Sequence, residues 1–176
     1  ATQGITDVSQ LRFEEGLKEL NLTGNQIVDL SGLTLPEGLK ELNLDNNQIV
    51  DVSGLTLPKG LKVLYLYNNQ IVDVSGLTLS EGLKHLLLGN NQIVDVSGLT
   101  LPEGLKVLWL DRNQIVDVSR VIKKSCPNLT YLDLSRNPIS RAEINRIRKE
   151  LVGCQVRAND LLPAPDLKLA PSSDLP

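Results

Sequence analysis

The feature that most constrains the fold of this chain is an internal repeat of 22 residues. The segment LKELNLDNNQIVDVSGLTLPEG, residues 39–60, recurs with small changes from positions 17, 61, 83 and 105, and a further copy starts at position 129 after a step of 24 residues. Each copy carries the pattern LxxLxLxxNxI. One copy cannot bury its leucines alone, so the copies must stack into a solenoid with a continuous core.

Alternation within the pattern LxLxx predicts one short strand in each repeat. In the second copy, Leu42 and Leu44 point to one side, and the residues between and beside them point to the other. Stacked copies then form a parallel sheet with strands about 4.8 Å apart. The return segments, such as IVDVSGLTLPEG, have no room for a long helix. We expect short turns or 3₁₀ pieces there.

An asparagine follows each strand at the point where the chain must turn. The set consists of Asn25, Asn47, Asn69, Asn91, Asn113 and Asn137. An amide side chain in this place satisfies backbone groups of neighbouring turns that would otherwise be buried without a partner. We therefore predict a structural asparagine ladder rather than a ligand site.

A row of aspartates raises the question of a metal. Asp51, Asp73, Asp95 and Asp117 each precede a Val-Ser pair. A calcium-binding row is one interpretation, but the dense oxygen-ligand spacing of calcium loops is missing. Local caps from side chain to backbone explain the pattern better, and we expect no metal and no cofactor.

The two ends of the chain differ from the repeats. A longer sixth repeat predicts a short helix from Ser119, and Ser140 with Glu143 predicts a capped helix over about 140–151 that ends before Gly153. We expect a solenoid over 1–161 and a Pro-rich tail over 162–176.

A degraded seventh copy follows the capping helix. It is expected at Leu151, Cys154, Val156, Asn159 and Leu161. This register places Cys154 where a core leucine stands and offsets it from Cys126. We expect two buried thiols, although a disulfide stays open.

The recurring consensus resembles the leucine-rich repeat family over roughly residues 3–161. The repeat length and the NxIxxVxxL continuation are most similar to the internalin-like or phosphatase-regulator-like subclass, whereas the LPEGLK turn is similar to bacterial repeats with an LPxxL element. The resemblance implies an α/β solenoid: a horseshoe with a parallel concave β-sheet and a capping helix. It also implies binding of other proteins on the concave sheet.

The outward strand positions carry every tyrosine and the tryptophan of the chain. These aromatic residues are Tyr65, Tyr67, Trp109 and Tyr131, with Val63, His85, Leu87 and Val107 between them. Asp111, Arg112, Asp133 and Arg136 follow at one end. We expect these twelve residues to form an exposed patch that binds a partner, because Tyr and Trp are enriched at interface hot spots. Strand propensity alone is the competing explanation.

The predicted function is a protein–protein interaction module. No nucleophile, acid pair, metal cluster or phosphate loop indicates an enzyme. An idealised or engineered repeat scaffold without an evolved ligand, and a glycan-binding platform, are the alternatives. A net charge of −3 and the lack of a long apolar run argue against nucleic acid and membrane insertion. We expect a monomer, and both a secreted or cell-surface and a cytoplasmic location stay open.

Overall fold

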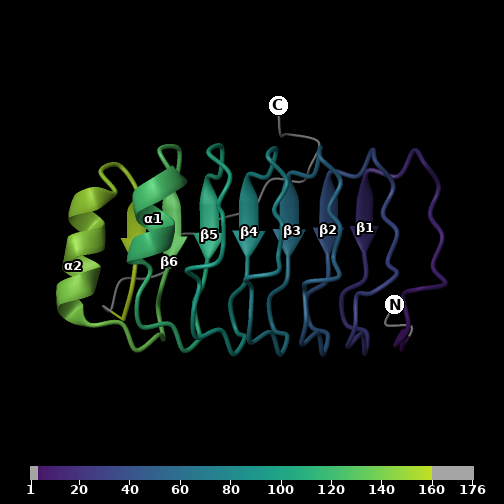
Figure 1. Cartoon of the computed structure of the whole chain (residues 1–176), viewed down its shortest axis with the longest axis horizontal. Coiled ribbons are helices and arrows are strands. Elements are labelled where there is room, and N and C mark those ends of the chain that lie inside the picture. Colours follow the sequence, from purple (N-terminus) through teal and green to yellow (C-terminus); the bar gives the residue numbers. More distant parts are fainter. Residues whose placement is uncertain (1–3, 160–176) are drawn as a thin grey trace.

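The structure, a computed structural model, describes residues 4–159, so the predicted tail over 162–176 and Leu161 lie outside the described residues. Seven strands form one parallel sheet in chain order (Figure 1). The strands are β1 (Glu19–Asn21), β2 (Glu41–Asn43), β3 (Val63–Tyr65), β4 (His85–Leu87), β5 (Val107–Trp109), β6 (Tyr131–Asp133) and β7 (Gln155–Arg157). The predicted α/β solenoid is confirmed.

The register of the sheet follows the sequence repeat. Leu42 pairs with Leu64, and Leu64 pairs with Leu86, so equivalent residues of successive copies lie side by side. These inward leucines are fully buried, as is Ile49 on the return segment of the second copy. The core is one continuous aliphatic layer between the sheet and the return segments.

The return segments cover one face of the sheet as turns (Figure 1). Each Asp-Val-Ser triplet closes locally: Ser53 N–H, for example, donates to Asp51 Oδ1 at 2.8 Å. Two helices, α1 (Ser119–Ser125) and α2 (Arg141–Glu150), replace turns toward the C-terminal end. Between residues 4 and 159, neither helix has the length and apolar character needed to cross a bilayer.

Hydrogen bonds of the asparagine ladder join neighbouring repeats. The Asn69 amide donates to Leu44 O at 3.0 Å in the preceding repeat and to Leu66 O at 3.3 Å in its own. Its Oδ1 accepts from Ile49 N at 3.0 Å. One buried side chain therefore satisfies backbone groups of two turns, and the same arrangement recurs at Asn47, Asn91, Asn113 and Asn137.

Helix α2 covers the last core layer, as predicted. Ser140 Oγ accepts from Glu143 N at 3.2 Å and caps the helix. Ile144 and Ile147 are buried against the core, and Gly153 turns the chain with a φ of 87°.

The predicted register of the seventh copy was wrong by two residues. Leu132 pairs with Val156, not with Cys154, and Val156 occupies the core position. The chain needs 24 residues from Leu132 to Val156 because helix α2 and its turn take up more chain than a short return segment. The step from Leu108 to Leu132, which carries α1, has the same length.

The shifted register changes the roles of two residues. Cys154 is partly buried beside the core and Cys126 is buried; both are free thiols, and burial raises the pKa of each to about 11. Asn159 does not take the equivalent ladder position. Its Oδ1 accepts from Arg136 N and its amide donates to Asn137 O, so it closes the end of the sheet.

Removing one rung of the ladder should destabilise the whole solenoid. Asn69→Ala leaves the Ile49 amide and the Leu44 carbonyl without the partner that the side chain supplied. We expect the free energy of unfolding to fall by about 2 kcal/mol or more, because buried unpaired groups are costly. Urea denaturation measures it, with Gln70→Ala at the exposed neighbouring position as control. Equal midpoints for the two variants would contradict the role of the ladder.

Candidate functional site

The concave face, defined here as the sheet surface opposite the return segments, presents three rows of side chains across the strands. The first row is Glu19, Glu41, Val63, His85, Val107, Tyr131 and Gln155. The second row is Asn21, Asn43, Tyr65, Leu87, Trp109, Asp133 and Arg157. The third row, just beyond the strands, is Thr23, Asp45, Tyr67, Gly89, Asp111 and Ser135. All the predicted aromatic residues therefore lie on one face.

The prediction that the aliphatic residues between the aromatics are exposed was wrong. Val63 is 2% and Leu87 4% exposed, and Val107, His85 and Tyr131 are also buried. Strands about 4.8 Å apart bring side chains of one row into lateral contact, so bulky neighbours cover a valine or leucine between them. Among the aromatic residues of this face, Tyr65, Tyr67 and Trp109 are half-buried and reached by solvent.

The aromatic side chains are fixed by their neighbours. The rings of Trp109 and Tyr131 are 6.3 Å apart between centroids and tilted by 59°. The Tyr131 hydroxyl donates to Asp133 Oδ2 at 3.4 Å. Tyr65 shares a hydrogen bond with Glu41, and burial, followed by the charges of nearby carboxylates, raises the pKa of Tyr65 to about 12. A tyrosine held in this way keeps its neutral hydroxyl at physiological pH.

The predicted polar end of the patch divides into a buried and an exposed part. Asp133 is only 3% exposed and accepts from Ser135 N at 2.9 Å and from Arg157 Nη1 at 3.3 Å. Its carboxylate therefore stabilises the turn after β6 and the contact with β7, and the prediction that Asp133 is exposed was wrong. Arg112 and Arg136 are exposed in left-handed turns with φ of 54° and 57°.

Two carboxylates of the third row have strongly raised pKa values. Burial is the main cause in both, and raises the pKa of Asp45 to about 6 although its Oδ1 accepts from Tyr67 N at 2.7 Å. The pKa of Asp111 is also raised to about 6, by burial and then by the charge of Asp133. Sequence reasoning named Asp111 but missed Asp45, which its place in the same row could have revealed.

A second asparagine row was also missed. Asn68 donates to Asn46 Oδ1 at 2.7 Å, and Asn90 donates to Asn68 Oδ1 at 2.6 Å, on the exposed turns beside the third row. All three have φ between 53° and 56°. Asparagine tolerates this left-handed conformation better than most residues, which is the clue that the sequence offered. The row ends where Arg112 takes the same turn position.

His85 lies in the first row between Val63 and Val107. Burial, followed by the charge of Lys106, lowers its pKa, and its Nδ1 has no hydrogen-bond partner in the described part of the chain. These surroundings favour a neutral imidazole. Across residues 4–159, no three His, Cys, Asp or Glu side chains are grouped to hold a metal ion.

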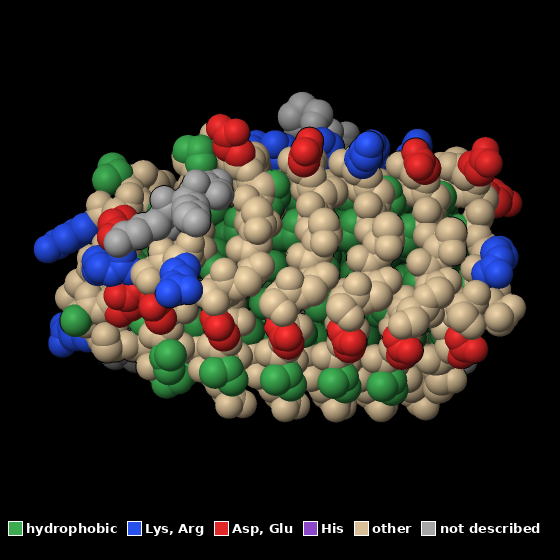
Figure 2. Space-filling model, in the orientation of Figure 1, with side chains coloured by type: hydrophobic (Ala, Val, Ile, Leu, Met, Phe, Trp, Pro, Cys, Tyr) green, Lys and Arg blue, Asp and Glu red, His purple; other side chains and the backbone are tan. Residues whose placement is uncertain are grey.

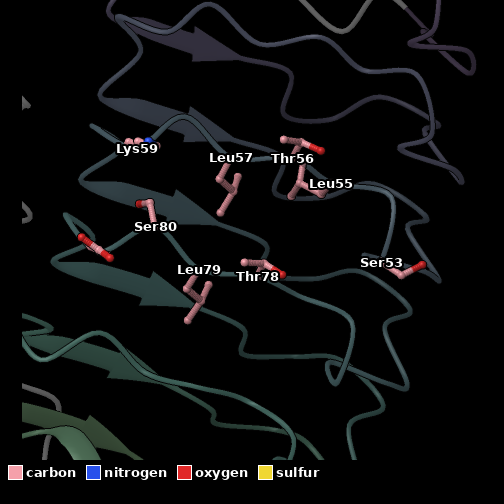
Figure 3. A pocket seen from close by; sticks show the side chains of 9 residues that line it. Ser53, Leu55, Thr56, Leu57, Lys59, Thr78, Leu79 and Ser80 are labelled. Carbon is pink, nitrogen blue, oxygen red and sulfur yellow. The ribbon is translucent and has the colours of Figure 1, made fainter.

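The return segments contain hollows of their own. A groove of about 480 Å³ lies between the second and third copies and is lined by Leu57, Leu79 and hydroxyl side chains (Figure 3). Ser80 of the third copy stands there in the place that proline takes in the first, second and fourth copies, and its Oγ donates to Leu61 O at 3.2 Å. The groove has no aromatic lining residue, so it lacks the stacking surface expected of a glycan site.

The edge of the return segments carries two parallel rows, one acidic and one apolar (Figure 2). The apolar row, called here the valine row, consists of Val28, Val50, Val72, Val94 and Val116, each 44–57% exposed. Hydrogen bonds from the following serines lower the pKa values of the adjacent Asp29, Asp73, Asp95 and Asp117. This exposed row was not predicted, because its valines lie in the near-identical return segments, whereas the predicted binding residues were those that vary between copies.

The opposite pKa shifts of Asp111 and Asp73 predict opposite effects of removing their charges. The native pKa of Asp111 lies above its unfolded value near 3.9, so the native state binds more protons and the charge costs stability as pH rises from about 4 through 6. Asp111→Asn should raise the free energy of unfolding by about 1–2 kcal/mol at pH 7.5 and change little at pH 3.5.

Asp73→Asn is the matched control, and it should lower stability at pH 7.5, since the native pKa of Asp73 is depressed. Urea denaturation of both variants at the two pH values measures the difference. The account is contradicted when both substitutions shift the midpoint at pH 7.5 in the same direction.

Comparison with known proteins agrees with the repeat and the fold. A family model of leucine-rich repeats, described as two copies, matches residues 15–57, 37–81, 59–101, 81–123 and 103–146. Among curated protein sequences, none matches the chain.

Two solved structures of Listeria monocytogenes internalins are similar to the chain. The internalin inlF is 28% identical with a TM-score of 0.75, and the match covers 89% of this chain and 47% of that one. The internalin C2 (inlC2) is 30% identical with a TM-score of 0.63, and the match covers 89% of this chain and 77% of that one. The chain thus spans about half the length of inlF. From its sequence repeat, its single parallel sheet and these matches, the chain belongs to the leucine-rich repeat family, with repeats of the internalin-like kind.

Proposed function

We propose that this chain is a protein-binding module that docks a partner protein on its concave face. Tyr65, Tyr67 and Trp109 serve as anchors, and the buried residues of the same face form the base on which they stand. Leucine-rich repeat proteins generally mediate protein–protein interactions and are typically non-enzymatic, which supports the class of function.

The observation that carries the proposal is where the copies differ. The return segments of the first to fourth copies are almost identical, whereas the outward positions change from Glu41, Asn43 and Asp45 to Val63, Tyr65 and Tyr67 in the next copy. The inward leucines and the ladder asparagines, which join one copy to the next, stay the same in these copies. The outward changes therefore point to a function of the concave face.

Because the aliphatic residues are buried, the proposed site consists of partly exposed aromatic rings on a packed base rather than of a wholly exposed apolar patch. Partly exposed aromatic rings on a packed base lose little side-chain freedom on docking, because their neighbours already hold them. Tyr and Trp also offer both apolar area and a polar group to a partner. The Trp109 indole Nε1 has no partner within the described chain and is a donor that a docked backbone carbonyl would satisfy after a small ring movement.

Capture of a partner by two sets of variants tests which surface binds. The concave set is Tyr65→Ala, Tyr67→Ala and Trp109→Ala, and the matched control set is Val50→Thr, Val72→Thr and Val94→Thr on the valine row. We expect the intact chain and the control set to capture the same protein, and the concave set to lose it by tenfold or more, as for hot-spot anchors.

Circular dichroism and urea midpoints must show that both sets remain folded. Loss of capture in the control set alone would move the site to the valine row. Capture that neither set changes would contradict binding through either surface and favour a scaffold without an evolved ligand.

A further inference from the structure

We propose that the concave face receives a lysine or arginine side chain of the partner, seated against Tyr67, Trp109 and the Asp111 carboxylate. This inference rests on the proposed function, because it names the chemistry of the partner at that same face. It depends on how the side chains meet around Gly89.

Gly89 is the position of the third row that has no side chain. A Cβ built there would lie 2.2 Å from Asp111 Oδ1 and 2.9 Å from Tyr67 Cδ2. The carboxylate and the aromatic ring therefore lean over the same glycine from two sides. Any larger residue at this place would hold them apart.

The Asp111 carboxylate is poorly compensated. Its side chain is 13% exposed, and its Oδ1 is buried without a hydrogen-bond partner among residues 4–159. Its Oδ2 is 3.7 Å from Arg112 Nε, whose side chain is 44% exposed, so this pair is weak. Arg157, which also faces Asp111, already donates to Asp133. Asp111 therefore lies near two arginines, and neither of them forms a close ion pair with it.

Aromatic rings beside an unpaired carboxylate form a favourable environment for a cation. A lysine or arginine head group gains from the faces of Tyr and Trp and from a charge-assisted hydrogen bond to the carboxylate. Asp45 precedes Tyr67 in the third row, where its Oδ1 accepts from Tyr67 N, and adds a second negative charge on the far side of that residue. An acidic partner residue would instead meet Asp45, Asp111 and Asp133, so charge selects a basic one.

The Asp111 charge links binding to pH. A cation favours the deprotonated carboxylate, whose pKa is about 6 in the free chain. The groups that face it are Asp133, Arg112 and Arg157, and the nearby ring is Tyr67. Affinity for a cationic group should therefore be full above pH 7 and fall roughly tenfold by pH 5.

Trp109, the single tryptophan of the chain, supplies the readout. The probe is the peptide acetyl-GKGKGKG-amide, compared with its glutamate counterpart, titrated at low ionic strength and pH 7.5. We expect the lysine peptide to change Trp109 fluorescence saturably and the glutamate peptide to have no effect. A lysine peptide without effect, or equal responses to both peptides, would overturn the inference.

Two variants and one control test the seat itself. Asp111→Asn should weaken the lysine peptide roughly tenfold at pH 7.5 and remove most of the pH dependence. Gly89→Ala should weaken it as well without changing any charge. Asp73→Asn removes an equal charge on the opposite side and should leave the response of Trp109 unchanged.

The outcomes separate this inference from the proposed function. Equal affinity in Asp111→Asn and Asp73→Asn overturns the cationic seat. If the cationic seat is overturned but the concave set loses partner capture, the proposed binding through the concave face still holds. Conversely, capture that persists in the concave set contradicts the proposed function, whatever the peptide does.

Discussion

The hydrogen bonds of the buried asparagines are the interaction on which the rest of the structure depends. A chain that turns sharply after a three-residue strand would leave carbonyl and amide groups inside the solenoid without partners. One amide such as Asn69 satisfies groups of its own turn and of the preceding repeat at once. The ladder thus joins each copy to the next and fixes the turns beside the concave face.

Folding and the surface chemistry depend on different positions of each repeat, which explains why the two sides of the solenoid differ. The leucines and asparagines meet the demands of folding, and each return segment repeats the same local caps. Outward strand positions are then free to carry groups that folding does not need. Asp45 and Asp111 are examples, because burial disfavours the charge of each carboxylate and raises its pKa. Carboxylates with raised pKa values are common at functional sites.

Much of the fold could be predicted because each structural feature of the sequence recurs in five or six copies. The leucine alternation gave the strands, and Ser140 and Gly153 marked the ends of the capping helix. The last register failed because a single degraded copy offers no repetition, and Leu151, Asn159 and Leu161 match the consensus in the register that the structure does not adopt. The length of helix α2 and its turn sets the observed register, and this length depends on packing.

The concave face was predictable in composition but not in exposure. Alternation shows that Leu87 points outward, yet whether solvent reaches it depends on the size of its lateral neighbours in β3 and β5. The same holds for the carboxylates, because the pKa of Asp111 follows from what covers it and from the gap at Gly89. Such properties belong to pairs of strands, whereas the sequence pattern describes one strand at a time.

Amide hydrogen exchange of the free chain tests most directly that the ladder holds the binding surface in a preformed shape. The amides of Ile49, Ile71 and Ile93 donate to ladder asparagines rather than to backbone. The account predicts that they exchange as slowly as the strand amides of Leu64 and Leu86, through the same cooperative opening. Fast exchange at the three isoleucines beside protected strands would show turns that open on their own, and would contradict a preformed concave surface.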